Sequence, residues 1–100
     1  MARSRISLSD ILKRYTEHVY FQPPTGTKIV YPCIIYKLEN MNVKFADNGP
    51  YQLFDEYSIL YITRDPEDMR IHDLALLPLC RLNRTYTEDN LYHYRYTIYN

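Results

Sequence analysis

The sequence predicts a small α+β domain in which two helices pack on one antiparallel or mixed sheet. An apolar stripe at helical spacing opens the chain, and alternating β-branched and aromatic residues fill its middle and its end. A second, short helical pattern lies between these strand segments. The chain has 100 residues, 46% of them apolar, which suits one core and one domain over residues 1–100. The expected order is α-β-β-β-α-β-β, with residues 1–6 as a flexible N-terminal arm.

The first helix is expected from about Ser7 to Tyr20. Ser7 and Asp10 resemble a capping box at its start, and Pro23 and Pro24 stop the chain from continuing as a helix. One apolar stripe follows helical spacing and predicts the buried side. It consists of Leu8, Ile11, Leu12, Tyr15 and Val19.

Three strands are expected next, at residues 29–37, 43–46 and 51–63. The first is apolar on both faces around Cys33–Tyr36, as in a central strand, and Pro32 marks its start or an edge. Asp47–Pro50 is a strong turn because Asn48 and Gly49 accept positive φ cheaply. The segments on either side therefore suggest an antiparallel hairpin or meander.

A second helix is expected from Asp65 to about Leu77. Asp65 can cap it, Pro66 suits the first helical position, and Pro78 ends it. Two more strands follow at residues 80–86 and 91–99, joined at 87–90. In the last strand an aromatic and apolar set alternates strictly with polar residues, which indicates a half-buried strand. That set is Tyr92, Tyr94, Tyr96 and Ile98.

Composition excludes several classes of protein. The formal net charge is zero, which argues against a generic polyanion binder or a membrane-surface protein. No apolar run is long enough for a transmembrane helix, and the first residues lack the apolar region of a signal peptide. Cys33 and Cys80 lie among apolar residues, so we expect two reduced thiols in a cytosolic protein.

No pattern for catalysis stands out, so we expect no enzyme activity and no cofactor. The chain has two glycines and neither a P-loop nor a dinucleotide-binding pattern. Two minor alternatives remain open. One is a metal site made by convergence of Cys33, Cys80, His72 and His93. The other is a cation held by Asp65, Glu67, Asp68 and Asp73, although the start of a helix explains most of these acids without an ion.

Twelve tyrosines in so short a chain favour an assembly subunit, because tyrosine is enriched at protein interfaces. A nucleic-acid-binding module is the alternative, since basic residues interleaved with aromatics bind single strands by stacking. The residues that suggest it are Arg81, Arg84, Arg95, Tyr86, Tyr92, Tyr94 and Tyr96.

Charge is unevenly distributed along the chain. Residues 1–14 carry a net +3, and residues 47–73 carry seven acids against two arginines, a net −5. Opposite patches on one subunit suit head-to-tail association, in which a basic face meets the acidic face of a neighbour. An ordinary solvated surface of mixed charge is the equally weighted alternative.

Five segments of the chain resemble a family of tailed-phage structural proteins. They are Val19–Pro24 (VYFQPP), Tyr31–Tyr36 (YPCIIY), Lys44–Asn48 (KFADN), Thr63–Asp68 (TRDPED) and Cys80–His93 (CRLNRTYTEDNLYH). The last is the most specific, and the likeness spans roughly Leu8 to Tyr99. The family is that of the tail terminators, or tail completion proteins, of the head-to-tail connection. The predicted order of elements is similar to that of tail terminator folds.

The resemblance implies a homo-hexameric ring that caps the tail tube at the head-proximal end of the virion tail, after assembly in the host cytoplasm. Its implied partners are other copies of itself, the tail tube protein and a head-closure or connector protein. DNA would pass through the lumen without being read, and no membrane is involved. A head-closure or adaptor ring is the alternative role within the same region of the particle.

No individual functional residue is transferred from the family, and two sets are expected from this chain's own sequence. The first is an inter-subunit interface around the central turn and the fifth segment, with Arg81 and Arg84 facing an acidic partner. It comprises Phe45, Asp47, Asn48, Arg81, Arg84 and Tyr86. The second is a set of lumen-facing acids that repel phosphates. It comprises Asp65, Glu67 and Asp68.

Overall fold

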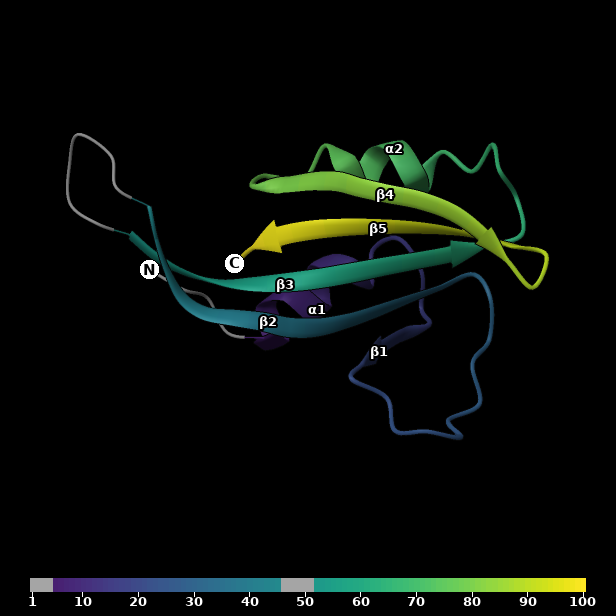
Figure 1. The fold of residues 1–100 in the computed structure, drawn as a ribbon, viewed down its shortest axis with the longest axis horizontal. Helices are drawn as coiled ribbons and strands as arrows, with labels where there is room; N and C mark the ends of the chain where they lie inside the picture. Colours follow the sequence, from purple (N-terminus) through teal and green to yellow (C-terminus); the bar gives the residue numbers. More distant parts are fainter. Residues whose placement is uncertain (1–4, 46–51) are drawn as a thin grey trace.

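A computed structural model describes the backbone of residues 5–45 and 52–100, and the side chains of residues 5–41 and 54–100. Five strands form one mixed sheet in the order β1-β2-β3-β5-β4, and two helices accompany it (Figure 1). The elements are α1 (Arg5–Leu12), β1 (Val19–Phe21), β2 (Cys33–Phe45), β3 (Gln52–Thr63), α2 (Arg70–Ala75), β4 (Cys80–Glu88) and β5 (Leu91–Tyr99). The predicted fold class and element order are confirmed.

The first helix is shorter than predicted and starts earlier. α1 ends at Leu12, and Arg5 and Ile6 belong to it rather than to a flexible arm. Ser7 lies inside the helix, so the predicted capping box at the helix start is wrong. Val19 and Tyr20, expected at the end of the helix, instead form β1 together with Phe21, and β1 pairs in parallel with β2. This parallel pair makes the sheet mixed.

The predicted strands at 29–37 and 43–46 are parts of one long strand, β2. Two register shifts interrupt its antiparallel pairing with β3, on either side of Asn40. These irregularities explain why the sequence reads as two short strands, because each breaks the alternation of faces. The β2–β3 hairpin continues to the pair Phe45↔Gln52, whereas β5 pairs with β3 only as far as Glu56. The hairpin therefore extends beyond β4 and β5 (Figure 1).

The helix after β3 is also shorter than predicted. α2 covers six residues, with Met69 as its N-cap position, so Asp65 does not cap it. Asp65 instead shapes the preceding turn: its Oδ1 accepts the Glu67 N–H at 2.9 Å. The acidic residues predicted to begin the second helix therefore lie in a turn that precedes a shorter helix.

β4 and β5 form an antiparallel hairpin with a two-residue turn. Glu88 pairs with Leu91, and the two turn residues, Asp89 and Asn90, have φ values of 54° and 61°. This left-handed pair is typical of the type I′ turns that match the twist of paired strands. The predicted joint at residues 87–90 is confirmed, with β4 two residues longer than expected.

Both helices pack on one face of the sheet, where they bury a single apolar core. Leu8 and Leu12 come from α1, and Ile71 and Leu74 come from α2. In Figure 1 α1 crosses behind β2 and β3. The sheet contributes an alternate set from each strand, as the period of two requires. That set includes Ile34, Tyr36, Tyr57, Ile59, Tyr61, Tyr96 and Ile98.

Candidate interaction site on the open sheet face

The sheet face opposite the helices, called the open face here, carries the other alternate set of each strand. Arg95 and Thr97 alternate with the core residues Tyr96 and Ile98, so they lie on the open face. Residues directly opposite one another on paired strands share a face. The register therefore also places Arg84, opposite Arg95, on the open face.

Three arginines gather where β4 and β5 cross this face, and we call Arg81, Arg84 and Arg95 the arginine surface. Arg84 lies opposite Arg95, and Arg81 lies opposite Thr97. Two like charges in directly opposed positions destabilise a sheet unless something compensates them. Among the residues that the structure describes, no ion pair joins these arginines to a carboxylate. The arginine surface is therefore a concentrated positive charge on the edge strand β4 and its neighbour β5.

Tyr86 borders the arginine surface and lies on the same face. Its ring stacks on His93, with 4.7 Å between ring centroids and 14° between planes. The guanidinium carbon of Arg84 lies 5.2 Å from the centroid of the same ring. These two contacts occupy the π-surface of Tyr86, so the ring positions Arg84 and is not free to stack on a base.

A second charged region, the acidic end, lies where β3 leaves the sheet and the β4–β5 hairpin turns. Four exposed carboxylates gather there, and Thr63↔Tyr92 is the last strand pair before them. Figure 1 places the β3–α2 connection and the hairpin turn at the same end of the molecule. Arg64 lies among the acids, with its guanidinium 5.9 Å from the Tyr31 ring centroid. The acidic end comprises Asp65, Glu67, Glu88 and Asp89.

Asp65 and Glu67 line a shallow hollow of about 490 Å³ at this end. Arg64 and Arg70 also line it, and Arg64 already lies over the Tyr31 ring. Arg70 neutralises Asp68, so the hollow itself is of mixed charge. With Glu88 and Asp89, however, the four exposed carboxylates of the acidic end outnumber Arg64, and they can accept charge-assisted hydrogen bonds from guanidinium groups.

Asp68, predicted with these acids, is not exposed. Its side chain is 8% exposed and accepts hydrogen bonds from the Tyr61 hydroxyl at 2.6 Å and from Arg70 Nη2 at 2.8 Å. Burial would raise its pKa, but the hydrogen bonds from Arg70 and Tyr61 outweigh burial and lower the pKa to about 2. Arg70 also donates to the Tyr15 carbonyl at 3.1 Å. Asp68 is therefore a structural carboxylate whose charge is neutralised inside the fold.

The remaining predicted interface residues divide between two parts of the chain. Arg81, Arg84 and Tyr86 lie together on the β4–β5 hairpin. Phe45 is the last residue of β2, at the protruding end of the β2–β3 hairpin. Asp47 and Asn48 lie outside the described residues. The structure thus brings together three of the predicted residues and adds Arg95, which the sequence suggested only for nucleic-acid binding.

The tyrosines expected to accompany these arginines lie on the other side of the sheet. Tyr96 is fully buried, and its hydroxyl donates to the Ile71 carbonyl at 2.7 Å. Tyr94 packs against the core, and Tyr92 follows the same alternation. The single basic and aromatic surface imagined from the sequence is therefore wrong, because strand alternation sends Tyr92, Tyr94 and Tyr96 away from the arginines.

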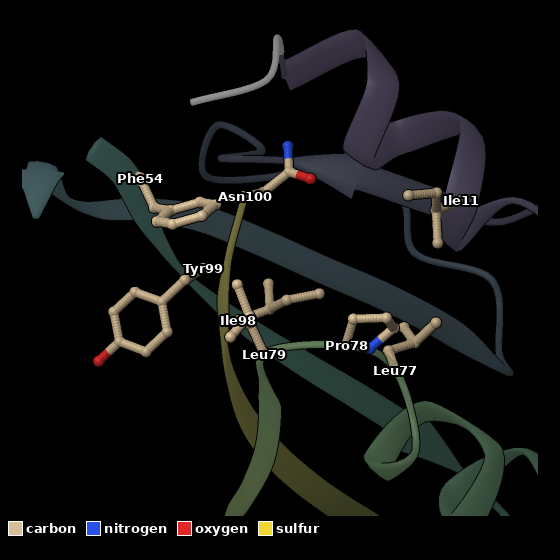
Figure 2. Close-up of a pocket in the computed structure, with 8 residues that line it drawn as sticks. All are labelled: Ile11, Phe54, Leu77, Pro78, Leu79, Ile98, Tyr99 and Asn100. Carbon is tan, nitrogen blue, oxygen red and sulfur yellow. The ribbon is translucent and has the colours of Figure 1, made fainter. Parts of the chain in front are cut away.

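An apolar hollow of about 140 Å³ lies between α1, the α2–β4 connection and the end of β5. Figure 2 shows Leu77, Pro78, Leu79 and Ile98 gathered around it, while the Tyr99 ring points away. Beside it, Leu76 is 81% exposed. No Asp, Glu, His, Lys or Arg side chain lines this hollow, so it offers apolar contact rather than acid–base chemistry.

Both cysteines are free thiols, in agreement with the reduced state expected from the sequence. Burial raises the pKa of each to about 11, so both are protonated at neutral pH. Within residues 5–45 and 52–100, no group of three or more His, Cys, Asp or Glu side chains is placed to hold a metal ion. No helix in the same ranges is long and apolar enough to cross a membrane.

Comparison of the chain with models of protein families, with curated proteins and with solved structures found no match.

Proposed function

We propose that this chain is a structural subunit that assembles with copies of itself. Two features support a subunit role. The arginine surface and the acidic end carry opposite charge at separate places on one small domain. In the part of the chain that the structure describes, no helix covers one face of the sheet, and β4 leaves its outer edge unpaired. An unpaired edge can pair with another chain, and complementary charged surfaces steer and orient association.

Within that class, we propose a tail terminator of a tailed phage. The observation that carries this proposal is a coincidence of sequence and structure. Cys80–His93, the most specific segment of the resemblance, forms β4, the hairpin turn and the start of β5. This segment carries two of the three residues of the arginine surface, Arg81 and Arg84, and half of the acidic end. Apart from Arg95, the charged residues of both regions thus lie in segments that resemble the family.

The proposed mechanism is geometric. Copies of the chain form a homo-hexameric ring on the last layer of the tail tube and cover its exposed edges, so the ring leaves no template for further tube subunits. The protruding end of the β2–β3 hairpin, which includes Phe45, is the element that reaches furthest from the helix-covered core. We assign it to contact with a neighbouring protein of the tail, either the tube protein or a head-closure protein.

DNA would pass through the lumen of this ring without sequence-specific contact. Of the three acids predicted to repel its phosphates there, Asp68 is buried against Arg70. Asp65 and Glu67 remain exposed. A lumen role therefore rests on these two side chains, and the contact proposed below is a rival use for them.

A head-closure or adaptor ring is the second candidate, because it uses the same kind of subunit at the neighbouring interface. A nucleic-acid-binding module is a third candidate, favoured only by the arginine surface. The contacts of Tyr86 with His93 and Arg84 weaken it, because base stacking needs a free aromatic face.

The test is electron microscopy of particles made by a phage that lacks this gene. A terminator predicts tails of uncontrolled length beside filled heads without tails. Supplying the wild-type chain from a plasmid should restore normal tail length. Tails of normal length beside emptied heads would instead assign the chain to head closure, and intact infectious particles would contradict both roles.

A further inference from the structure

We propose that the arginine surface of one copy binds the acidic end of the next copy, so that the chain associates head to tail. This inference rests on the proposed function and deepens it, because it names the contact that holds the ring together. It joins Arg84 and Arg95 of one subunit to Asp65 and Glu67 of its neighbour.

The first step is that the two regions cannot neutralise each other within one chain. Glu88 lies four residues beyond Arg84 on β4, about 13 Å at the rise of an antiparallel strand. Leu60, which pairs with Arg95, lies five positions before Asp65, about 16 Å along the chain. No ion pair between the two regions occurs among the described residues. The two regions therefore keep net charges of opposite sign, with Arg64 offsetting one of the four acids, and both are exposed to a second copy.

The second step is the choice of a second copy over other occupants. Pairing of two β4 edges with each other would bring Arg81 and Arg84 of both copies together, and like charges in opposed positions are destabilising. A nucleic acid would meet the arginines but also the four carboxylates of the acidic end, and these carboxylates repel its phosphates. The exposed carboxylates at the acidic end of a second copy match the charge of the guanidinium groups and can accept their hydrogen bonds.

The third step is symmetry. A contact between two different surfaces of the same chain is heterologous, so each copy still offers one unused surface after it binds a neighbour. Such a contact closes into a ring when its rotation allows and forms an open filament when it does not. One kind of contact is therefore enough to build a ring, which is what a tail cap requires.

The test uses two charge-reversal variants, Arg84→Glu/Arg95→Glu and Asp65→Lys/Glu67→Lys. Each alone places like charges across every contact, and we expect its self-association to weaken by at least about tenfold. Mixed one to one, they form two complementary contacts: the wild-type pairing in one direction and the swapped pairing in the other. Sedimentation velocity should show that the mixture regains the wild-type assembly, with the two variants in equal amounts.

Matched controls carry the same change in charge on other exposed positions. Lys13→Glu/Arg14→Glu and Asp10→Lys/Asp73→Lys alter residues outside both regions, and we expect both to assemble like the wild type. Circular dichroism checks that each variant is folded. If Arg84→Glu/Arg95→Glu does not fold, the single variant Arg84→Gln replaces it in the same comparison. In a separate test, raising the salt concentration must weaken assembly of the wild-type chain.

Three results would overturn the contact. One is a wild-type chain that stays monomeric at high concentration and low salt. Another is a folded Arg84→Glu/Arg95→Glu variant that assembles normally. The third is an Arg84→Glu/Arg95→Glu variant that assembles normally but no longer binds a DNA fragment that the wild type binds. That result would indicate that the arginine surface binds nucleic acid. Uncontrolled tail length in the gene deletion together with any of these results would keep the terminator role while rejecting this contact.

Discussion

Asp68 joins three parts of the fold through one carboxylate. It accepts from Tyr61 on β3 and from the backbone and side chain of Arg70 at the start of α2. Arg70 in turn reaches the Tyr15 carbonyl after α1. The sequence gives no sign of this, because Asp65, Glu67 and Asp68 are the same residue types within four positions. The path of the backbone after β3 decides which of these three acids is buried.

We predict that Asp68→Asn lowers the free energy of unfolding at pH 7 by about 2–3 kcal/mol. The change removes charge-assisted hydrogen bonds and leaves Arg70 without its counter-charge, and the partial exposure of Arg70 keeps the loss below that of a fully buried pair. Urea unfolding followed by circular dichroism measures it. Asp73→Asn, at an exposed position of α2, is the control and should stay within about 0.5 kcal/mol of the wild type.

The same residue predicts a pH dependence with a defined sign. The pKa of Asp68 falls from 3.8 to about 2 in the folded chain, so its stabilising effect is present above pH 3.8 and is lost as pH falls toward 2. The wild type should therefore lose stability more steeply than Asp68→Asn across this acid window. Equal slopes for the two proteins in urea unfolding at each pH would contradict the lowered pKa.

At the scale of elements, the boundary between α1 and β1 could not be predicted from the sequence. The apolar stripe from Leu8 to Val19 fits a helix, but the chain leaves the helix after Leu12. Thr16 explains the change, because its hydroxyl donates to the Pro32 carbonyl at 3.1 Å and accepts the His18 N–H at 3.2 Å. This tie aligns Val19–Phe21 with β2, which is a long-range contact that local periodicity does not contain.

The β4–β5 hairpin was predictable because its signals are local. Alternation marks β5, and Asp89 and Asn90 tolerate the positive φ that the turn requires. The arginine surface was only partly predictable. Arg81 and Arg84 stand out in the sequence, but a register shift between Leu82 and Arg84 decides that Arg84 faces Arg95. Such a shift reverses the face of every later side chain, and it follows from strand pairing rather than composition.

We predict that Asn90→Val destabilises the hairpin by about 1–2 kcal/mol, because a β-branched residue is strained at φ 61°. Asn90→Gly should keep or raise stability, since glycine accepts this conformation without strain. Thr85→Val, at an exposed position in the middle of β4, is the matched control and should leave stability nearly unchanged. Thermal unfolding measures all three, and equal melting temperatures for the Val and Gly variants at residue 90 would refute the argument.

At the scale of the whole molecule, buried phenols are spread through the core and connect its parts. Tyr36, Tyr61 and Tyr96 are the largest fully buried side chains, and they come from three different strands. Tyr96 also ties β5 to α2 through the Ile71 carbonyl. Because each ring contacts several elements, none of them can reach water through a local opening of one loop. Ionisation of Tyr61 and Tyr96, whose pKa values are raised by burial, should therefore report unfolding of the entire domain.

We predict that ionisation of Tyr61 and Tyr96 is the last step of the alkaline titration and coincides with loss of structure. Burial raises the pKa of Tyr96, and burial and the hydrogen bond to Asp68 raise that of Tyr61. Folded-state values above the unfolded value of 10.0 mean that this stabilisation is complete below pH 10 and is lost as pH rises above it. Phenolate absorbance and circular dichroism, recorded on the same samples, measure the two processes.

Tyr96→Phe should remove one phenolate from the last step and lower stability by about 1 kcal/mol. If the phenolate that Tyr96→Phe removes forms while the circular dichroism signal of the wild type stays native, the Tyr96 ring is not held by the common core.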